Sequence, residues 1–228
     1  MGDEHWPLFG LRLHTPRLEL RPATDDDLFA LADAAAAGIH APGAMPFNVP
    51  WSEQPPGVLE RGVVQHGWSV RAGWTTAAWN VPLAVLVDGE VVGSQNVFAH
   101  DFLITRAVET GSWLTRARQG NGLGREMRAA ALALAFDGLG ATHCTTAAFD
   151  DNPASLGVTR SFGYDDDGWS LRARQGRPAR LLRFRIDRDR WEAHRRHEVD
   201  IEGLGPCLTM FGLDADGRPL PGIVDPMV

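Results

Sequence analysis

The chain has 228 residues, a formal net charge of −7, a hydrophobic fraction of 44% and 8 tryptophans. This composition excludes a disordered protein and predicts one core of good size, while the acidic balance makes nucleic acid a poor partner. No apolar run approaches the roughly 18 residues of a membrane span, and the N-terminus lacks the segments of a signal peptide. We therefore expect no membrane association and a cytoplasmic protein.

The apolar periodicity predicts alternating strands and helices. The first half of the chain is expected to form a strand at 17–21, a helix after the capping box at 24–27, a proline-rich loop at 40–51, a helix at 58–79 and a hairpin of strands 83–87 and 91–98. The second half is expected to form a strand at 109–114, a helix at 125–139, a strand at 142–149, a short helix ending near 163, and strands at 168–174 and 180–186. This order predicts an α/β domain over residues 1–187, with a mixed central sheet of about seven strands flanked by helices. Residues 188–228 form a C-terminal extension, a charged helix followed by an irregular segment.

Three residue types narrow the chemistry. All 22 basic residues are arginine, so a lysine nucleophile and a P-loop lysine are both excluded. Cys144 and Cys207 lack an adjacent base, and we expect small buried residues without a disulfide. His194 and His197 lie among arginines, which repel a cation, so we assign no metal.

A glycine-rich loop joins the strand at 109–114 to the next helix. It reads Arg118-Gln119-Gly120-Asn121-Gly122-Leu123-Gly124. Glycines let the backbone approach an anion closely, and the free N–H groups of a helix start attract a phosphate or pyrophosphate. The alternative is a tight turn that binds nothing. The glycine spacing fits neither a P-loop nor a dinucleotide fingerprint, which disfavours a nucleotide-binding oxidoreductase.

The pattern Gln119-x-x-Gly122-x-Gly124 resembles the coenzyme A pyrophosphate loop of the GNAT family of N-acyltransferases. A second segment, Asn152-x-x-Ser155 followed by Gly163-Tyr164, resembles the same family, and 17–21 and 111–114 are most similar to its RimJ/RimL-like branch. The resemblance covers roughly residues 14–187. It implies the GNAT fold and transfer of an acetyl group from acetyl-CoA, or of another acyl group from its acyl-CoA, to a primary amine in a ternary complex.

The resemblance also implies a binding site for the co-substrate. The pantetheine arm would pair with the strand at 109–114, and the pyrophosphate would lie at the loop, with Arg118 or Arg125 close by. The implied coenzyme A residues are Trp113, Leu114, Gln119, Gly120, Asn121, Gly122, Leu123, Gly124, Arg125, Asn152 and Ser155.

Two catalytic residues are implied. Glu109 matches the strand glutamate that serves as base in many GNAT enzymes; the alternative is a surface carboxylate. The family's usual tyrosine acid is replaced by Thr159, so Ser155 becomes the candidate partner of the thiolate, or else a helix hydroxyl without a chemical task. The proline-rich loop, Asn48 and the region of Trp79 are expected to shape the acceptor and acyl pocket.

The branch acts on protein N-termini, aminoglycosides and small amines, so a small-molecule amine, a protein N-terminus and a lysine all remain open as acceptors. A weaker resemblance to an actinobacterial subgroup, through residues 5–9, 45–51 and the extension, implies succinyl-CoA as an alternative donor. The missing tyrosine keeps open a second class, a non-catalytic acyl-CoA-binding regulator.

The extension carries apolar residues that are too few for a separate core. They must pack on the domain or on a neighbouring chain, and we expect a homodimer or higher homo-oligomer through the extension and the adjacent strand. These residues are Trp191, Leu204, Leu208, Met210 and Phe211.

Overall fold

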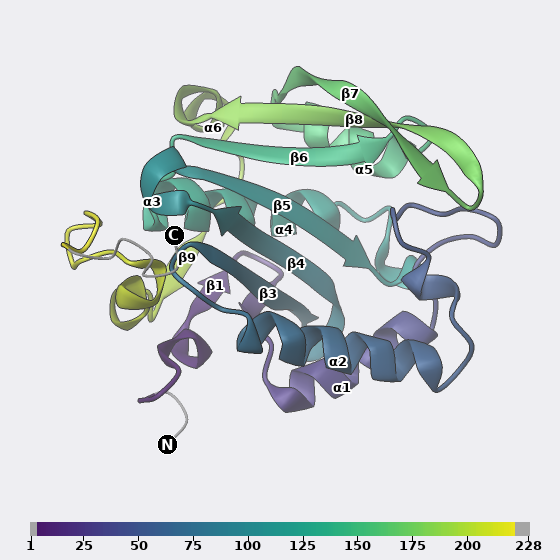
Figure 1. Cartoon of the computed structure of the whole chain (residues 1–228), viewed down its shortest axis with the longest axis horizontal. Helices are drawn as coiled ribbons and strands as arrows, with labels where there is room; N and C mark the ends of the chain where they lie inside the picture. The colour runs from purple at the N-terminus through teal and green to yellow at the C-terminus, as the bar shows by residue number, and fades with distance from the viewer. Residues whose placement is uncertain (1–3, 222–228) are drawn as a thin grey trace.

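The computed structural model describes residues 4–221, which fold around a mixed sheet of nine strands in the order β7-β8-β6-β5-β4-β3-β2-β1-β9 (Figure 1). Every neighbouring pair is antiparallel except β5 and β6. The α/β class is confirmed, but the expected number of strands is too low because β1 and β9 are too short to show alternation. The strands are β1 (Arg12–His14), β2 (Glu19–Pro22), β3 (Ala78–Val87), β4 (Glu90–His100), β5 (Ala107–Leu114), β6 (His143–Phe149), β7 (Asp165–Arg174), β8 (Arg177–Asp187) and β9 (Asp200–Glu202).

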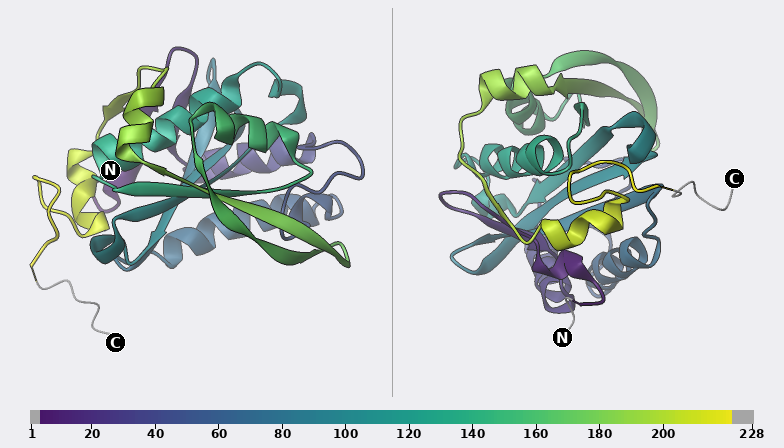
Figure 2. Two further views of the ribbon diagram at one scale, coloured as in Figure 1. Left: turned by 90° about the horizontal axis from the view of Figure 1, so that it is seen from above. Right: turned by 90° about the vertical axis from the view of Figure 1, so that its left-hand side faces the viewer.

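Helices cover both faces of the sheet, with α1 and α2 on one face and α4 and α5 on the other (Figures 1 and 2). α1 begins at the predicted capping box, in which Thr24 and Asp27 exchange hydrogen bonds between side chain and backbone. α4 runs on into a π-turn at Leu134–Gly138. The helices are α1 (Asp25–Ala36), α2 (Val58–Ala72), α3 (Phe102–Thr105), α4 (Leu123–Ala133), α5 (Pro153–Ser161) and α6 (Arg188–His194).

The helix expected over residues 58–79 is wrong at its C-terminal end. α2 stops at Ala72, Gly73 follows, and β3 begins at Ala78. From there the residues pair with β4, and Trp79 lies opposite Ala99. Trp79 is 3% exposed and packs in an aromatic cluster with Trp74, Phe102 and Phe211, so it does not shape the pocket.

The two central strands separate partway along their length. β5 and β6 pair only from Ala107–Glu109 to His143–Thr145. Beyond this point β5 stays with β4 as far as Leu114, whereas β6 stays with β8 as far as Phe149. The strands therefore form a wedge, visible in Figure 1, that is narrow at Glu109 and opens toward the start of α4.

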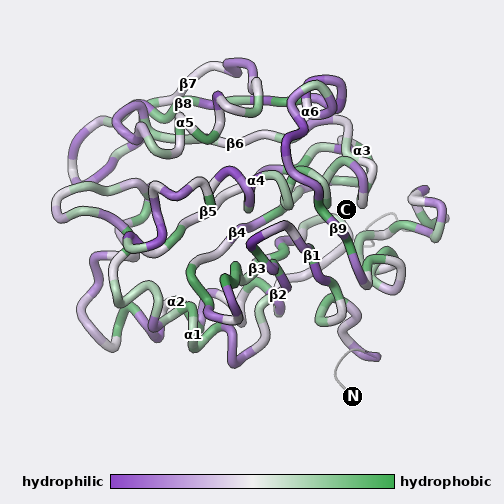
Figure 3. The backbone as a smooth tube through the Cα atoms, turned by 180° about the vertical axis from the view of Figure 1, so that it is seen from behind, coloured by the Kyte–Doolittle hydropathy of each residue, from purple (hydrophilic) through white to green (hydrophobic). Residues whose placement is uncertain are grey.

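The C-terminal extension packs on its own domain. β9 pairs with β1, at the end of the sheet opposite β7. Trp191 and Phe211 are both 0% exposed, and Trp191 lies between Phe136 and Phe162, with ring centroids 6.4 and 6.2 Å away. Figure 3 shows hydrophilic colouring through α6 and hydrophobic colouring in the segment after β9. The packing within one chain accounts for the apolar residues of the extension.

Candidate active site

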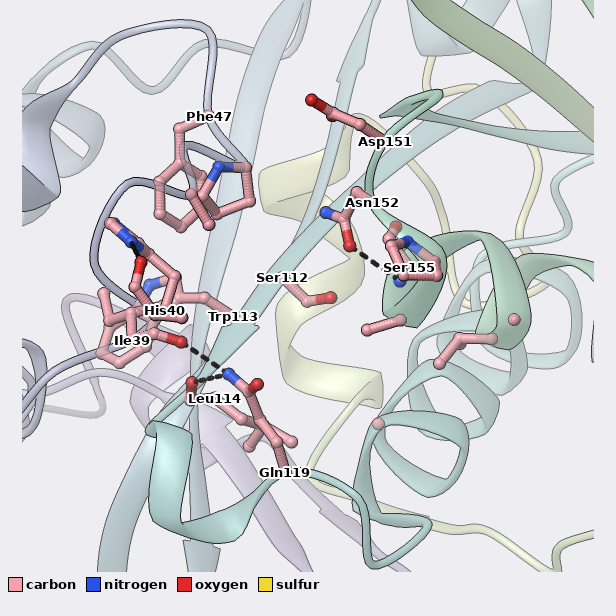
Figure 4. Close-up of a pocket in the computed structure, with 18 of the residues that line it drawn as sticks. Ile39, His40, Phe47, Ser112, Trp113, Leu114, Gln119, Asp151, Asn152 and Ser155 are labelled. Atoms are coloured by element: carbon pink, nitrogen blue, oxygen red, sulfur yellow. Dashed lines mark hydrogen bonds between the residues drawn. The ribbon is translucent and has the colours of Figure 1, made fainter.

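A cavity of about 650 Å³ lies at the wide end of the wedge, between β5 and α5 (Figure 4). Its walls are the end of β5, the loop before α4, the first turns of α4 and α5, and the proline-rich loop at 39–47. Arg174 and Gln175, from the tip of the β7–β8 hairpin, complete the rim. The cavity is thus built from segments far apart in the sequence, which meet because β5 and β6 separate.

The glycine-rich loop is fixed by the side chain of Gln119. Its Nε2 donates to the carbonyl oxygens of Ile39 at 2.6 Å and Leu114 at 2.9 Å (Figure 4). Gly120 and Gly122 have φ values of +79° and +82°, which other residues rarely adopt. α4 begins at Leu123, so the N–H groups of Leu123 and Gly124 have no partner within the helix, an arrangement that suits an anion.

The back of this loop is held by an ion pair. Arg17 donates to the carbonyl oxygen of Asn121 at 3.0 Å and lies 2.6 Å from Oε2 of Glu126. Glu126 is 1% exposed and also accepts from Thr15 at 2.7 Å. Burial alone would raise the pKa of Glu126, but the hydrogen bonds from Thr15 and Arg17 hold it below its ordinary value, so the carboxylate is charged.

Asn152 and Ser155 form the start of α5. Asn152 is the N-cap, and its Oδ1 accepts from the backbone N–H of Ser155 at 3.1 Å (Figure 4). Both residues line the cavity. Thr159, one turn further on, is 0% exposed, so it does not replace the missing tyrosine.

Glu109 lies at the narrow end of the wedge, in register with Phe98 of β4 and Thr145 of β6. Alternation along β5 places it on the face of Trp113, which packs against α1 and α2. It does not line the cavity. Its side chain reaches solvent, yet the surrounding protein raises its pKa by desolvation, partly opposed by His100. A carboxyl group with a raised pKa is suited to act as a base.

Most of the residues expected to bind coenzyme A meet at this cavity. Of these residues, Asn121 and Leu123 do not line it, because Asn121 is exposed at the surface and Leu123 is 6% exposed in the core. Arg118 is paired with Glu90, whereas Arg125 faces the cavity. The predicted residues that line it are Trp113, Leu114, Gln119, Gly120, Gly122, Gly124, Arg125, Asn152 and Ser155.

Some residues that line the cavity were not predicted from the sequence. The proline-rich loop was expected at the pocket, and its residues 40–41 and 43–47 line it, although Asn48 does not. Arg128 also lines the cavity. It lies four residues after Gly124 and hence on the same helix face, a spacing that could have revealed it. Arg174 reaches the site through the β7–β8 hairpin, which no local pattern indicates.

Three further features concern possible metal-binding groups, helices that could cross a membrane, and the two cysteines. Within residues 4–221, no group of three His, Cys, Asp or Glu side chains could hold a metal ion, and no helix is both long and apolar enough to cross a membrane. Cys144 and Cys207 are free and buried, which confirms the sequence prediction. Burial raises the pKa of both thiols to about 11, so both stay protonated at neutral pH.

The cavity thus lies beside a glycine-rich loop and a helix start, and the carboxyl group of Glu109 lies outside it, where β5 and β6 begin to separate. Residues 17–165 match the acetyltransferase (GNAT) domain family. The chain therefore belongs to the GNAT family of acyl-CoA-dependent N-acetyltransferases, whose co-substrate is acetyl-CoA.

Solved structures share the fold. RimL, described as a ribosomal L7/L12 alpha-N-protein acetyltransferase in complex with coenzyme A, is 18% identical, with 77% of this chain and 96% of that chain covered and a TM-score of 0.64. Mycobacterium smegmatis RimJ in complex with CoA-disulfide is 18% identical, with 90% and 95% covered and a TM-score of 0.63. A chimera of the Vibrio cholerae spermidine N-acetyltransferase SpeG is 17% identical, with 77% and 98% covered and a TM-score of 0.61. At these identities the likeness concerns the fold.

Proposed function

We propose that this protein transfers an acetyl group from acetyl-CoA directly to a primary amine within a ternary complex. The observation that carries the proposal is the wedge itself. Its wide end lies at the start of α4, where the first N–H groups suit an anion, and its narrow end carries Glu109, a carboxyl group with a raised pKa. A linear co-substrate bound at the wide end would run along β5 toward Glu109, which would reach the acceptor amine directly or through water.

The edge of β5 supplies the groups for the pantetheine arm. In an antiparallel pair, every second residue directs its N–H and C=O away from its partner strand. Between Glu109 and Leu114 those groups point into the space that β6 has left. The arm would occupy this space, with Trp113 and Leu114 beside the thioester carbonyl, whose oxygen would accept a backbone N–H.

The chemical steps follow from this placement. Glu109, directly or through a water molecule, removes a proton from the ammonium group of the acceptor. The amine nitrogen attacks the thioester carbon, a C–N bond forms and the π electrons move to the carbonyl oxygen. When the intermediate collapses, the C–S bond breaks and its electron pair goes to sulfur. The Ser155 hydroxyl, which lies in the same cavity, would then deliver a proton to the thiolate and regain one, through water, from the positively charged amide nitrogen.

The identity of the donor is tested by thiol release. We expect turnover with acetyl-CoA across a panel of amines, with succinyl-CoA as the second donor that the sequence suggests. The acceptors to be tested are small amines, a peptide with a free N-terminus and a peptide that contains lysine. Tight binding of acetyl-CoA without thiol release with any of these acceptors would instead identify a non-catalytic acyl-CoA-binding regulator.

Self-association also belongs to the proposal. The extension is occupied within its own chain, but β7 is an edge strand with Trp169 54% and Leu171 61% exposed. Unpaired edges with apolar side chains favour pairing between copies. We therefore expect a homodimer at micromolar concentration, and light scattering that gives the mass of a single chain would contradict this expectation.

A further inference from the structure

Arg128 is a buried cation in the wall of the cavity. It is 3% exposed, and its Nε and Nη1 atoms have no hydrogen-bond partner within the described residues. A guanidinium group carries five N–H donors and stays charged at any relevant pH. Burying such a group without an acceptor is costly, so a position of this kind requires a compensating ligand.

Within residues 4–221 no carboxylate forms an ion pair with Arg128, and the side chain that hydrogen-bonds to it is the neutral hydroxyl of Tyr164. Glu126, on the same helix, is already held by Arg17 and Thr15. Cys144 of β6 and Tyr164 after α5 lie close to Arg128, with the Tyr164 ring centroid 5.9 Å from its guanidinium carbon. Burial raises the pKa of both groups, so both are neutral near pH 7.

Arg128 lies toward the narrow end of the wedge. Its neighbour Cys144 is in register with Val108, within the short stretch where β5 and β6 still pair. Cys144 and Thr146 alternate with Thr145 along β6 and face α4, the opposite face from Glu109. The base and the buried cation therefore approach the thioester position from opposite faces of the sheet.

We propose that Arg128 is a catalytic residue that binds the sulfur of coenzyme A as negative charge develops on it. The inference rests on the proposed function. When the C–S bond breaks and its electron pair moves to sulfur, the free N–H groups of Arg128 donate to the thiolate. The guanidinium keeps its own protons, and the proton that completes the thiol comes from Ser155 or from water. Arg128 thus stabilises the charge on sulfur, whereas Ser155 or water gives the proton that the family's tyrosine acid would otherwise supply.

The product complex tests this assignment without turnover. Coenzyme A binding is measured first by calorimetry, and the ionisation of its thiol in the complex is then followed by ultraviolet difference absorbance from pH 6 to about 10, the range around ordinary thiol pKa values. Desulfo-coenzyme A provides the blank, which subtracts the titration of Cys144, Tyr164 and Glu109. Arg128→Met keeps the bulk and removes the charge, Arg128→Lys keeps the charge, and Arg125→Met removes the cation at the other end of the cavity.

We expect the midpoint of thiolate formation to lie at least about one pH unit lower in the wild-type complex than in Arg128→Met, with Arg128→Lys between them. Turnover of Arg128→Met should fall roughly 10²-fold, with less than about a threefold change in KM for acetyl-CoA. Arg125→Met should weaken binding and leave the midpoint unchanged. Equal midpoints in wild type and Arg128→Met, with coenzyme A bound to both, would overturn the inference alone. A wild-type protein that binds no coenzyme A would overturn the proposed function instead.

Discussion

Arg17 and Glu126 are 109 positions apart in the sequence, and their side chains meet 2.6 Å apart behind the anion-binding loop. Arg17 precedes β2, and Glu126 lies in the first turn of α4. Because Arg17 also donates to the carbonyl oxygen of Asn121, the pair connects the start of β2 to the loop. The shape of the anion site thus depends on a contact outside the cavity.

Glu126→Gln should lower the free energy of unfolding by about 2 kcal/mol at pH 7, because it weakens a buried ion pair whose arginine is half exposed. The folded-state pKa of Glu126 lies below its unfolded value, so its contribution is full above the unfolded value near 4.3 and is lost as pH falls through the folded value. The difference in the free energy of unfolding between variant and wild type should therefore be smaller at about pH 3 than at pH 7. Urea unfolding at both pH values measures it.

The control for this variant is Glu90→Gln, which removes the exposed partner of Arg118. Exposed pairs contribute little, so a change within about 0.5 kcal/mol is expected. Equal effects of the two substitutions at pH 7 would contradict the role of the buried pair.

Gly122→Ala should weaken coenzyme A binding by blocking close approach to the pyrophosphate. Its φ of +82° also strains any other residue, so a matched control is needed. Gly89, in the β3–β4 turn, has the same φ of +82° and open space around it. Both alanine variants should lose similar stability, but only Gly122→Ala should show a higher Kd by calorimetry. Equal affinities would refute the placement of the pyrophosphate.

Glu109→Gln should lower kcat roughly 10²-fold and leave binding of acetyl-CoA nearly unchanged. The base works when deprotonated, so wild-type activity should rise with pH through the raised pKa of Glu109. The variant should lack this acidic limb of the pH–rate profile. Full turnover of Glu109→Gln across the pH range would place the base elsewhere.

Arg174 joins the proline-rich loop to the rest of the cavity rim. It donates to the carbonyl oxygen of Met45 at 3.0 Å and to Oδ1 of Asp151 at 2.9 Å, and it lies 4.1 Å from the centroid of the Phe149 ring. Arg174→Met should raise KM for acetyl-CoA several-fold, because the loop loses its anchor over the bound arm. The control Arg177→Met, at the exposed tip of the same hairpin, should leave KM for acetyl-CoA unchanged. Steady-state kinetics distinguishes the two.

Local patterns predicted the parts of the fold that local forces determine. The Asp88-Gly89 turn between β3 and β4 and the cap at Thr24 appear where the sequence placed them. The end of α2 at Ala72 was missed because the apolar spacing of Trp74 and Trp79 also suits a helix, and their aromatic cluster forms only in the tertiary structure.

The same distinction holds for the candidate site. The loop from Gln119 to Gly124 and the cap at Asn152 are short motifs, and the sequence displays them directly. The spacing of Arg128 from Gly124 places it on the cavity face of α4, but its burial results from the packing of α4 under the wedge, which the sequence does not indicate. Arg174 reaches the rim because β7 and β8 form a long hairpin, a non-local pairing that sequence periodicity does not indicate.

Trp191→Ala tests whether the C-terminal extension is part of the fold. Trp191 is 0% exposed between two aromatic rings, so its removal leaves a cavity that the surroundings fill poorly. We expect a loss of about 3–5 kcal/mol in the free energy of unfolding. Trp169→Ala provides the control, because Trp169 is 54% exposed and the Arg180 guanidinium covers its ring, so the loss should stay below about 1 kcal/mol. Guanidinium unfolding measures both, and equal losses would show that the extension contributes no packing to the core.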